Sequence, residues 1–371
     1  MQLTKGGFLM EGRIDHTSQL PLYLQIKNLI LENIESRLWK AGTRIPAERG
    51  LAEELGVSQM TVNRSIQELV REGILTREVG SGTFVCKYPS HVTKNCKIAI
   101  VYPMSEERIM GVYYPQFIFR GIQESASKAS ISLTLLERIE QYSPTNEADG
   151  CIIIAPHIDR LDELNKFQGK YGIPLVVLGS HWPDATFHCV DSHNFQGTYD
   201  ITNHLISLGH KHIGSVIGET CQCNVRDRIA GYKAALEDAD LEVYEELTIH
   251  IDDLRDRKNN ELKIMKTLNS PLSPTAFTAV GYQFAIEVMS ILQDHGINIP
   301  EDLSIAGYDD PHSARYLTPS LTTVRQPLEE MGFKAIQLLK DIIDGKKVSD
   351  NIHLLPTELI IRESTAKPVS S

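Results

Sequence analysis

The sequence predicts an α/β protein in two parts, a small helical head that ends in a β-hairpin and a larger body of two α/β lobes. The first observation is the length of 371 residues, 42% of them hydrophobic and 23% charged, which suffices for two or three globular domains. The second is amphipathic helical spacing in residues 19–87. The third is the alternation of apolar runs with helical segments in residues 97–371, which is typical of parallel sheets covered on both faces.

Hydropathy and cysteine content exclude several classes of protein. No stretch approaches the ~20 consecutive apolar residues of a membrane helix, so no membrane partner is expected. The first residues show no apolar segment followed by a small-residue cleavage site, which argues against secretion. The six cysteines include no CxxC pair and are too few for a disulfide framework. We therefore expect a cytoplasmic protein with no metal site.

The charge is distributed unevenly between the head and the body. The whole chain carries a net charge of −11. Between Arg13 and Lys87, ten lysines and arginines stand against nine acidic residues, so this part carries +1 and the rest carries −12. An acidic body joined to a neutral-to-basic head is compatible with a negatively charged partner such as DNA, although solvated faces produce similar differences.

Three helices are predicted in the head. Apolar residues recur at helical spacing from residue 21 to residue 36, and a short second helix follows at residues 48–55. After a tight turn at Gly56, Ser58 is a good N-cap for a third helix that runs to about Glu72. Two short helices joined by a glycine-containing turn form a helix-turn-helix, whose second helix can enter the major groove of DNA.

A β-hairpin is predicted to follow the third helix, with strands at residues 74–78 and 83–86 around the turn at residues 80–82. The exposed face of the third helix carries Gln, Asn and Arg side chains, which can pair with base edges. A merely solvated face would carry a mixture of Glu and Lys instead. This composition favours DNA binding over the alternative, a small helical bundle with a hairpin.

Four motifs occur in order along the head: P-L-Y-x-Q-I, R-I-P-A-E-R, L-G-V-S and G-S-G-T-F-V. Together they resemble the winged helix-turn-helix of GntR-family transcription regulators. That family commonly reads S-R-x-T-V-R at the start of the recognition helix, whereas this chain has Gln59 and Asn63 in place of the two arginines, so a different operator sequence is expected. The resemblance and the polar helix face imply double-stranded operator DNA as a partner, with contacts from Arg49, Ser58, Gln59, Thr61, Asn63, Arg64 and Gly80.

The body is predicted to hold two α/β lobes with a cleft between them, because residues 97–371 are too many for one sheet of ordinary size. Ligands bind such sheets outside the carboxyl ends of the strands. The polar stretch at residues 88–96 is interpreted as a linker. Strands are expected at residues 98–101, 131–136, 151–155, 175–178, 213–217, 303–306 and 322–324, and helices at residues 117–129, 196–208, 226–236, 284–293 and 328–343.

A second set of motifs occurs in order in the body: L-G-H-K-H-I-G, R-I-A-G-Y, P-E-D-L-S-I-A-G-Y-D-D and L-T-P-S-L-T-T-V-R-Q-P. They resemble the effector domain of the LacI/GalR family, which is similar to periplasmic sugar-binding proteins. The resemblance implies a periplasmic-binding-protein-like fold and a small-molecule effector, expected to be a carbohydrate, held between the lobes. A GntR-type head on such a body is similar to the architecture of arabinose-responsive regulators of the AraR type.

The resemblance also implies effector-binding residues. The arginine of the family's R-x-A-G-[YFW] motif is here Arg228, and the aspartate of its G-Y-D motif is here Asp309. A guanidinium fork and a carboxylate suit neighbouring hydroxyl groups. The alternative is that Arg228 pairs with an acid and Asp309 caps a turn. Further contacts are expected from Tyr113, Tyr114 and Tyr282, and more weakly from Asp191 and the loop at His181 and Trp182.

Three departures from the LacI/GalR pattern concern the effector. The family's N-D-x-x-A motif reads G-Y-Q-F-A from Gly281, so a polar ligand contact is either lost or replaced by Tyr282. Leu254 stands roughly where an aromatic residue stacks on the effector. Only about a dozen residues separate Leu136 from Asp149, too few for the family's full second helix. The fold tolerates these changes, but they leave the effector class open.

The sequence thus predicts a ligand-responsive transcription regulator, expected to repress a carbohydrate-utilisation operon as a homodimer whose two heads read half-sites of a pseudo-palindrome. No catalytic motif is found, and neither a catalytic residue nor a cofactor is expected. One alternative is a pyridoxal-phosphate enzyme-like body, which needs a Schiff-base lysine and a longer chain. The others are an activator that responds to a nucleoside or other non-sugar effector, and a solute-binding protein for transport, which the head opposes.

Overall fold

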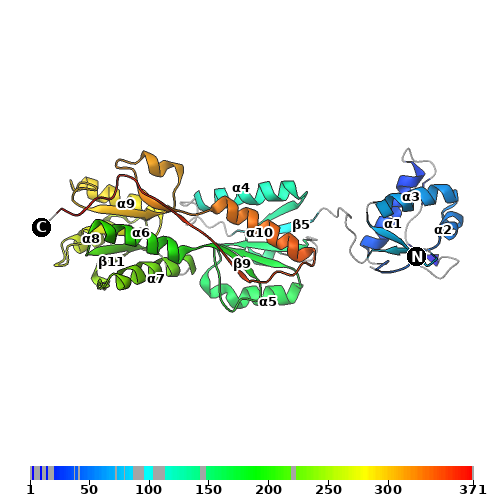
Figure 1. Cartoon of the computed structure of the whole chain (residues 1–371), viewed down its shortest axis with the longest axis horizontal. Coiled ribbons are helices and arrows are strands. Elements are labelled where there is room, and N and C mark those ends of the chain that lie inside the picture. The colour runs from blue at the N-terminus through cyan, green and yellow to red at the C-terminus, as the bar shows by residue number, and fades with distance from the viewer. Residues whose placement is uncertain are drawn as a thin grey trace. The chain divides into compact units, whose positions relative to one another are not determined.

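A computed structural model divides the chain into two compact units, Met1–Lys94 and Asn95–Ser371, which we call the head and the body (Figure 1). The structure describes residues 2–3, 9–10, 14–15, 21–36, 38–40, 42–71, 73–78, 80–86, 96–102, 113–142, 148–218 and 223–369. The expected linker at residues 88–96 therefore lies outside the described residues, apart from Cys96. Within the described ranges, no helix is long and apolar enough to cross a membrane.

Three helices with apolar stripes form the core of the head. Helix α1 spans Leu22–Glu35, α2 spans Glu48–Leu55 and α3 spans Gln59–Arg71, close to the ranges expected from the sequence. Apolar residues three or four positions apart lie on one face of each helix, and these faces pack together. The shared core includes Ile26, Ile30, Trp39, Leu51, Val62, Ile66 and Leu69.

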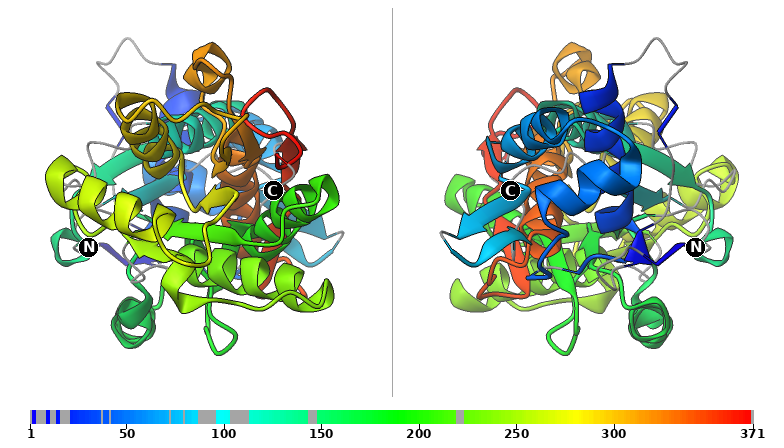
Figure 2. Two further views of the ribbon diagram at one scale, coloured as in Figure 1. Left: turned by 90° about the vertical axis from the view of Figure 1, so that its left-hand side faces the viewer. Right: turned by 90° about the vertical axis from the view of Figure 1, so that its right-hand side faces the viewer.

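A hairpin forms the wing of the head (Figure 2, right). Strand β3 (Leu75–Glu78) pairs antiparallel with β4 (Gly82–Val85). Gly80 in the connecting turn has a φ of +79°, a left-handed conformation that glycine adopts without steric cost. A second antiparallel pair consists of β1 (Gln2–Leu3) and β2 (Leu9–Met10).

The N-terminal lobe of the body is a six-stranded parallel sheet in the order β15-β9-β8-β7-β5-β6. Helices α4 and α10 cover one face of this sheet, and α5 covers the other. The strands are β5 (Lys97–Val101), β6 (Ser132–Leu136), β7 (Gly150–Ile154), β8 (Leu175–Leu178), β9 (His188–Ser192) and β15 (Ile352–Leu355), and the helices are α4 (Tyr113–Lys128), α5 (Leu161–Tyr171) and α10 (Leu328–Ile343).

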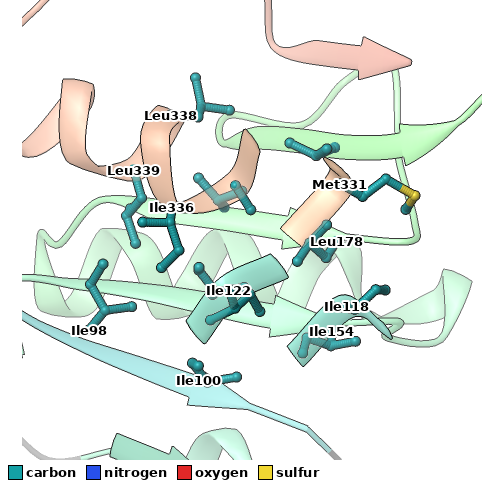
Figure 3. Close-up of a cluster of buried hydrophobic side chains, with 14 of the residues drawn as sticks. Ile98, Ile100, Ile118, Ile122, Ile154, Leu178, Met331, Ile336, Leu338 and Leu339 are labelled. Carbon is teal, nitrogen blue, oxygen red and sulfur yellow. The ribbon is translucent and has the colours of Figure 1, made fainter. Parts of the chain in front are cut away.

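Alternate residues of these strands face opposite sides of the sheet. Ile98 and Ile100 of β5 lie in one buried cluster with Ile122 of α4 and Ile336 of α10 (Figure 3). Ala99 and Val101 of the same strand lie in a second cluster, which contains Phe167 of α5. Burial on both faces explains why these strands read as continuous apolar runs in the sequence.

The C-terminal lobe is a second six-stranded sheet in the order β11-β10-β12-β13-β14-β16, parallel except for β16. Helices α8 and α9 pack on one side of this sheet, and α6 and α7 pack on the other (Figure 2, left). The strands are β10 (Ile213–Ile217), β11 (Thr248–His250), β12 (Ala276–Ala279), β13 (Ser304–Tyr308), β14 (Thr322–Arg325) and β16 (Glu358–Ile360), and the helices are α6 (Asn194–Leu208), α7 (Cys223–Asp238), α8 (Arg257–Leu268) and α9 (Tyr282–Asp294).

The chain passes between the lobes at three crossovers: from β9 to α6, from β14 to α10 and from β15 to β16 (Figure 1). Two hydrogen bonds join the three segments to one another. The hydroxyl of Ser192 donates to Oε1 of Gln326 over 2.6 Å. The backbone N–H of His193 donates to the carbonyl of Leu355 over 2.8 Å. The connection between the lobes is therefore a bundle of three hydrogen-bonded segments.

Helices α4 and α10 approach each other closely through two glycines. A Cβ atom on Gly121 would lie 1.9 Å from the carbonyl oxygen of Glu329, and one on Gly332 would lie 2.2 Å from the carbonyl oxygen of Ile118. Both obstacles are backbone atoms, which no rotamer change can remove. The two glycines therefore set the spacing of these helices.

Candidate DNA-binding surface and effector site

The first turn of α3 carries the polar residues expected at the recognition surface. Ser58 is the N-cap, as expected: its hydroxyl accepts a hydrogen bond of 3.1 Å from the N–H of Thr61. The Thr61 hydroxyl lies 2.7 Å from the same oxygen. Gln59 is exposed. Met60 is 82% exposed, the largest value among the large hydrophobic side chains of the described residues.

Asn63 is held by an acidic residue of the preceding helix. Its Nδ2 donates a hydrogen bond of 2.8 Å to Oε2 of Glu48, the first residue of α2. The other carboxylate oxygen of Glu48 pairs with the guanidinium of Arg77 in β3. One carboxylate therefore joins the recognition helix, the helix before it and the wing. The sequence gives no signal for this contact, because it spans 15 residues on one side and 29 on the other.

Arg64 points toward helix α1. Its guanidinium carbon lies 3.8 Å from the centroid of the Tyr23 ring, and its Nε lies 3.9 Å from Glu68. Arg49 is different, since its side chain is 84% exposed and pairs along its own helix with Glu53. At the wing, a Cβ on Gly80 would have nothing within 4 Å, so the turn leaves its backbone accessible.

The candidate effector residues come from both lobes of the body. Arg228 on α7 is 4% exposed. Its Nε donates to Oδ1 of Asn194 over 2.9 Å, its Nη1 donates to the carbonyl of Val280 over 2.5 Å, and its guanidinium lies 3.6 Å over the ring of Tyr308. The guanidinium is thus fixed by hydrogen bonds and stacking and makes no ion pair among the described residues.

Asp191 at the end of β9 is fully buried. Its Oδ1 accepts hydrogen bonds from the N–H of Ser192 over 2.8 Å and from Nδ2 of Asn194 over 3.2 Å. Its Oδ2 lies 3.2 Å from Nδ1 of His181, which follows β8. Asn194 contacts both Asp191 and Arg228, so it connects the two candidates across the first crossover.

His181 lies between two carboxylates from different lobes. Besides Asp191, its Nε2 lies 3.4 Å from Oδ2 of Asp227 on α7. The hydrogen bond with Asp191 raises the pKa of the imidazole, against an opposing effect of burial. Burial raises the pKa of the Asp227 carboxyl. His181 therefore links the N-terminal lobe to the C-terminal lobe through charge as well as contact.

Two tyrosines at the start of α4 face the C-terminal lobe in different ways. The hydroxyl of Tyr113 donates a hydrogen bond of 3.0 Å to the carbonyl of Asp310, which follows β13. The hydroxyl of Tyr114 is buried and finds no hydrogen-bond partner in the described part of the chain. Burial raises the pKa of Tyr114, and the nearby charges of Asp191 and Asp309 add to the shift, whereas Arg228 opposes it. The charges of three candidate effector residues therefore act on this hydroxyl.

Asp309 has a φ of 73°, an uncommon conformation for a residue with a side chain. Its Oδ1 accepts a hydrogen bond of 2.5 Å from Nε2 of Gln326, and its carbonyl accepts one of 2.7 Å from the hydroxyl of Thr323. Neighbouring Asp310 is committed to ion pairs with Arg325 and Arg362 at 2.7 Å. Asp309 has no such cation among the residues described, and its carboxylate is held there by the hydrogen bond from the neutral amide of Gln326.

Tyr282 lies apart from the other candidates in its hydrogen bonding. It is 8% exposed and packs in the core of the C-terminal lobe. Its hydroxyl donates to Oγ of Ser313 over 2.7 Å.

The structure adds Asn194 and Gln326, which sequence reasoning did not single out. Gln326 directly follows β14 and Asn194 lies two residues after the end of β9, and polar residues at that edge of a sheet are a usable signal.

No group of three or more His, Cys, Asp or Glu side chains in the described ranges is placed to hold a metal ion. The shortened connection between β6 and β7 agrees with the sequence. The described part of it contains only a short 3-10 helix at Ile139–Gln141. Leu254 packs partly buried against the core of the C-terminal lobe.

Comparison with known proteins accounts for both units. Residues 22–85 match the family of bacterial regulatory proteins, gntR family, and residues 202–365 match the periplasmic binding protein-like domain. An HTH-type transcriptional repressor PurR of Haemophilus influenzae is 33% identical over 340 residues, which cover 85% of this chain and 97% of that protein. The chain belongs to the same family of bacterial transcription repressors as this relative. It combines a GntR-type head with a LacI-type effector body, the architecture expected from the sequence.

Other relatives of this regulator span its full length or its body. An arabinose metabolism transcriptional repressor of Geobacillus stearothermophilus is 29% identical over 93% of this chain and 98% of its own. A LacI family transcriptional regulator from Enterococcus faecium with bound ribose is 29% identical and aligns with a TM-score of 0.62 over 73% of this chain and 99% of its own. A CelR–cellobiose complex, at 23% identity and a TM-score of 0.65 over 86% of this chain and 100% of its own, shares the fold. All three are transcription regulators.

Proposed function

We propose that this regulator represses transcription by binding double-stranded operator DNA and that a carbohydrate bound between the lobes of the body controls this binding. Residues 19–87 form the proposed DNA-binding domain, residues 88–96 the linker and residues 97–371 the effector-binding and dimerisation domain. We propose that the protein is a homodimer and that it binds DNA in the cytoplasm. The proposed DNA contacts are Arg49, Ser58, Gln59, Thr61, Asn63, Arg64 and Gly80, and the proposed effector contacts are Tyr113, Tyr114, Asp191, Arg228, Tyr282 and Asp309.

The main observation in support of the effector site is the buried hydroxyl of Tyr114, which has no hydrogen-bond partner among the residues that the structure describes. Nearly all buried polar groups of folded proteins have a hydrogen-bond partner, so an orphaned hydroxyl beside ionised groups marks a place where a ligand can supply the missing bond. The neighbouring charges are the guanidinium of Arg228 and the carboxylates of Asp191 and Asp309. Charge-assisted hydrogen bonds from such groups suit a ligand rich in hydroxyls. The names of the arabinose and ribose relatives support the same ligand class.

The arrangement at the crossovers supports control by lobe movement. A ligand between the lobes would contact Tyr114 and Asp191 of the N-terminal lobe together with Arg228 and Asp309 of the C-terminal lobe. Such a ligand binds one lobe arrangement more tightly than the other and shifts their populations. A 100-fold change in DNA affinity requires a preference of only about 2.7 kcal/mol. Lobe movement would change the spacing of two heads on paired half-sites.

A thermal-shift screen of the full chain against monosaccharides, disaccharides, sugar phosphates and nucleosides tests the ligand class. A ligand that binds only the folded state at 100 times its Kd stabilises it by about 2.7 kcal/mol. We expect the largest increase in Tm from a sugar, followed by release of bound DNA when that sugar is added. A nucleoside as the best ligand would overturn the carbohydrate proposal.

The Tyr114→Phe variant tests the site itself. It removes a hydroxyl that has no hydrogen-bond partner among the described residues, so the Tm without ligand should stay equal or rise. The increase in Tm caused by the sugar should shrink or vanish. Tyr232→Phe is the matched control, because its buried hydroxyl donates to the carbonyl of Ile213 over 2.7 Å. That variant should lower the Tm and leave the sugar response intact.

A further inference from the structure

Glu48 occupies an unusual position for an acidic residue on a unit that binds DNA. It begins α2, and its carboxylate contacts the recognition helix through Asn63 and the wing through Arg77. A carboxylate close to DNA is repelled by the phosphate groups, which dominate non-specific affinity. Arg77 supplies the opposite charge beside it. The other contact of Glu48 is with the amide of Asn63, which carries no charge. Neutralisation of charge therefore does not explain this second contact.

The chemistry of the pair fixes which way the amide of Asn63 points. An ionised carboxylate only accepts hydrogen bonds, and the amide nitrogen is the only donor of the Asn63 side chain. The 2.8 Å contact between Oε2 of Glu48 and Nδ2 of Asn63 therefore holds the nitrogen toward α2. Oδ1 has no protein partner within the described residues. The amide keeps Oδ1 and the second hydrogen of Nδ2 for another molecule.

Base edges differ in how they match an amide fixed in this way. In the major groove adenine offers an acceptor, N7, next to a donor, the N6 amino group, whereas guanine offers two acceptors, N7 and O6. An asparagine that presents an oxygen beside an N–H matches adenine with two hydrogen bonds. An asparagine that is free to rotate could instead turn its nitrogen toward either guanine acceptor. Control of the amide orientation is thus control of base choice.

We propose that Glu48 is a positioning residue that orients Asn63, so that the head selects adenine over guanine at the base pair that Asn63 contacts. This inference rests on the proposed function, in which α3 lies in the major groove. Arg77 neutralises the carboxylate and lets it remain close to the DNA. Glu48 itself makes no contact with the base.

The test is a selection from double-stranded DNA with a randomised segment, carried out with the full chain and followed by binding titrations on sites that differ at single base pairs. The wild-type chain should prefer adenine to guanine at one position of each half-site by at least about fivefold. Asn63→Ala should abolish the preference at that position only. Glu48→Gln should bring the adenine-to-guanine ratio close to one, because a glutamine amide can also donate to Oδ1 of Asn63 and allow the reversed orientation.

Two further variants separate orientation from charge and from folding. Arg77→Gln should weaken binding to all sequences and leave the adenine-to-guanine ratio unchanged. Glu53→Gln removes an exposed acid of the same helix, which pairs with Arg49, and should leave the ratio unchanged as well. An unchanged ratio in Glu48→Gln, at a position that Asn63→Ala alters, would overturn the positioning role while leaving the proposed function intact. Failure of the wild-type chain to select any sequence would overturn both.

Discussion

The hydroxyl of Tyr113 donates a hydrogen bond of 3.0 Å to the backbone carbonyl of Asp310, and this bond joins helix α4 of the N-terminal lobe to the segment after β13 of the C-terminal lobe. It lies outside the three covalent crossovers. Since it breaks if the lobes separate at this point, it contributes only to the arrangement seen here. Asp310 is itself anchored by Arg325 and Arg362, so the acceptor is rigid.

Tyr113→Phe should favour the separated lobes. A single neutral hydrogen bond contributes about 1 kcal/mol, which corresponds to roughly a fivefold loss of effector affinity if the ligand binds the arrangement described here. Isothermal titration calorimetry with the sugar found by screening measures this change. Tyr199→Phe is the control, since its hydroxyl bonds Asp238 within the C-terminal lobe over 2.8 Å. Equal affinities in the two variants would contradict a role of Tyr113 in lobe closure.

His181 should make the link between the lobes dependent on pH. Its pKa is raised in the folded protein, chiefly by the hydrogen bond with Asp191. The stabilisation by the charged imidazole is therefore fully present below the unfolded pKa of about 6.5 and is lost as the pH rises through the raised folded pKa. The Tm of the wild-type chain, relative to that of His181→Gln, should therefore fall as the pH rises from about 6.5 through the raised pKa. Scanning calorimetry at several pH values measures the difference.

Asp227→Asn provides the second half of the pH experiment. This substitution removes the carboxylate of the C-terminal lobe that lies beside His181. It retains the contact of His181 with Asp191. The pH-dependent difference in Tm should be smaller than in the wild-type chain and still present. If Asp227→Asn leaves the pH profile unchanged, the imidazole does not act between the lobes.

The spacing of α4 and α10 gives a prediction about stability alone. Gly332→Ala places a methyl group against the backbone of Ile118, and the cost of such overpacking is about 1–3 kcal/mol in the free energy of unfolding. Gly169→Ala in α5 is the matched control, because a Cβ there meets nothing within 4 Å. That variant should gain up to about 1 kcal/mol from the higher helix propensity of alanine. Urea titration of both variants measures the two effects.

Arg228→Lys tests whether the guanidinium fork is needed. Lysine keeps the charge but cannot reproduce both hydrogen bonds, to Asn194 and to the carbonyl of Val280, in the same planar geometry. We expect loss of the sugar response by at least about tenfold in affinity, with DNA binding retained. Arg257→Lys on α8, which pairs with Glu287 and Asp294, should respond normally. A normal response in Arg228→Lys would remove this residue from the effector site.

The elements that the sequence predicts best are those with a continuous or strongly periodic apolar pattern. Strands β8 and β10 and helices α2 and α10 match the expected ranges residue for residue. Helices α5 and α8 were not predicted. Helix α8 buries only Asn260, Ile264 and Thr267, two of which are polar, so its sequence shows no apolar stripe. Strands β11, β15 and β16 are short and lie at sheet edges.

The residues of the candidate site that could be predicted are those that lie in recognisable sequence motifs. Arg228 and Asp309 lie in the R-I-A-G-Y and G-Y-D-D segments, and the charges of both act on the hydroxyl of Tyr114. The supporting contacts could not be predicted, because they depend on side-chain rotamers and on the return of the chain at each crossover. The bond between Gln326 and Asp309 depends on both.

The N-terminal lobe depends on residues that the ribosome synthesises late. Strand β15 pairs with β9 at the edge of its sheet, and α10 covers the face that holds Ile98 and Ile100, yet both elements follow residue 327. During translation α4 alone can therefore cover this apolar face of the sheet until α10 has been made, after strands β10 to β14 of the C-terminal lobe. The head, whose core lies within residues 26–85, is complete early. A nascent chain of this regulator should consequently be able to fold its head long before its body, and its chaperone demand should be greatest just before α10 leaves the exit tunnel.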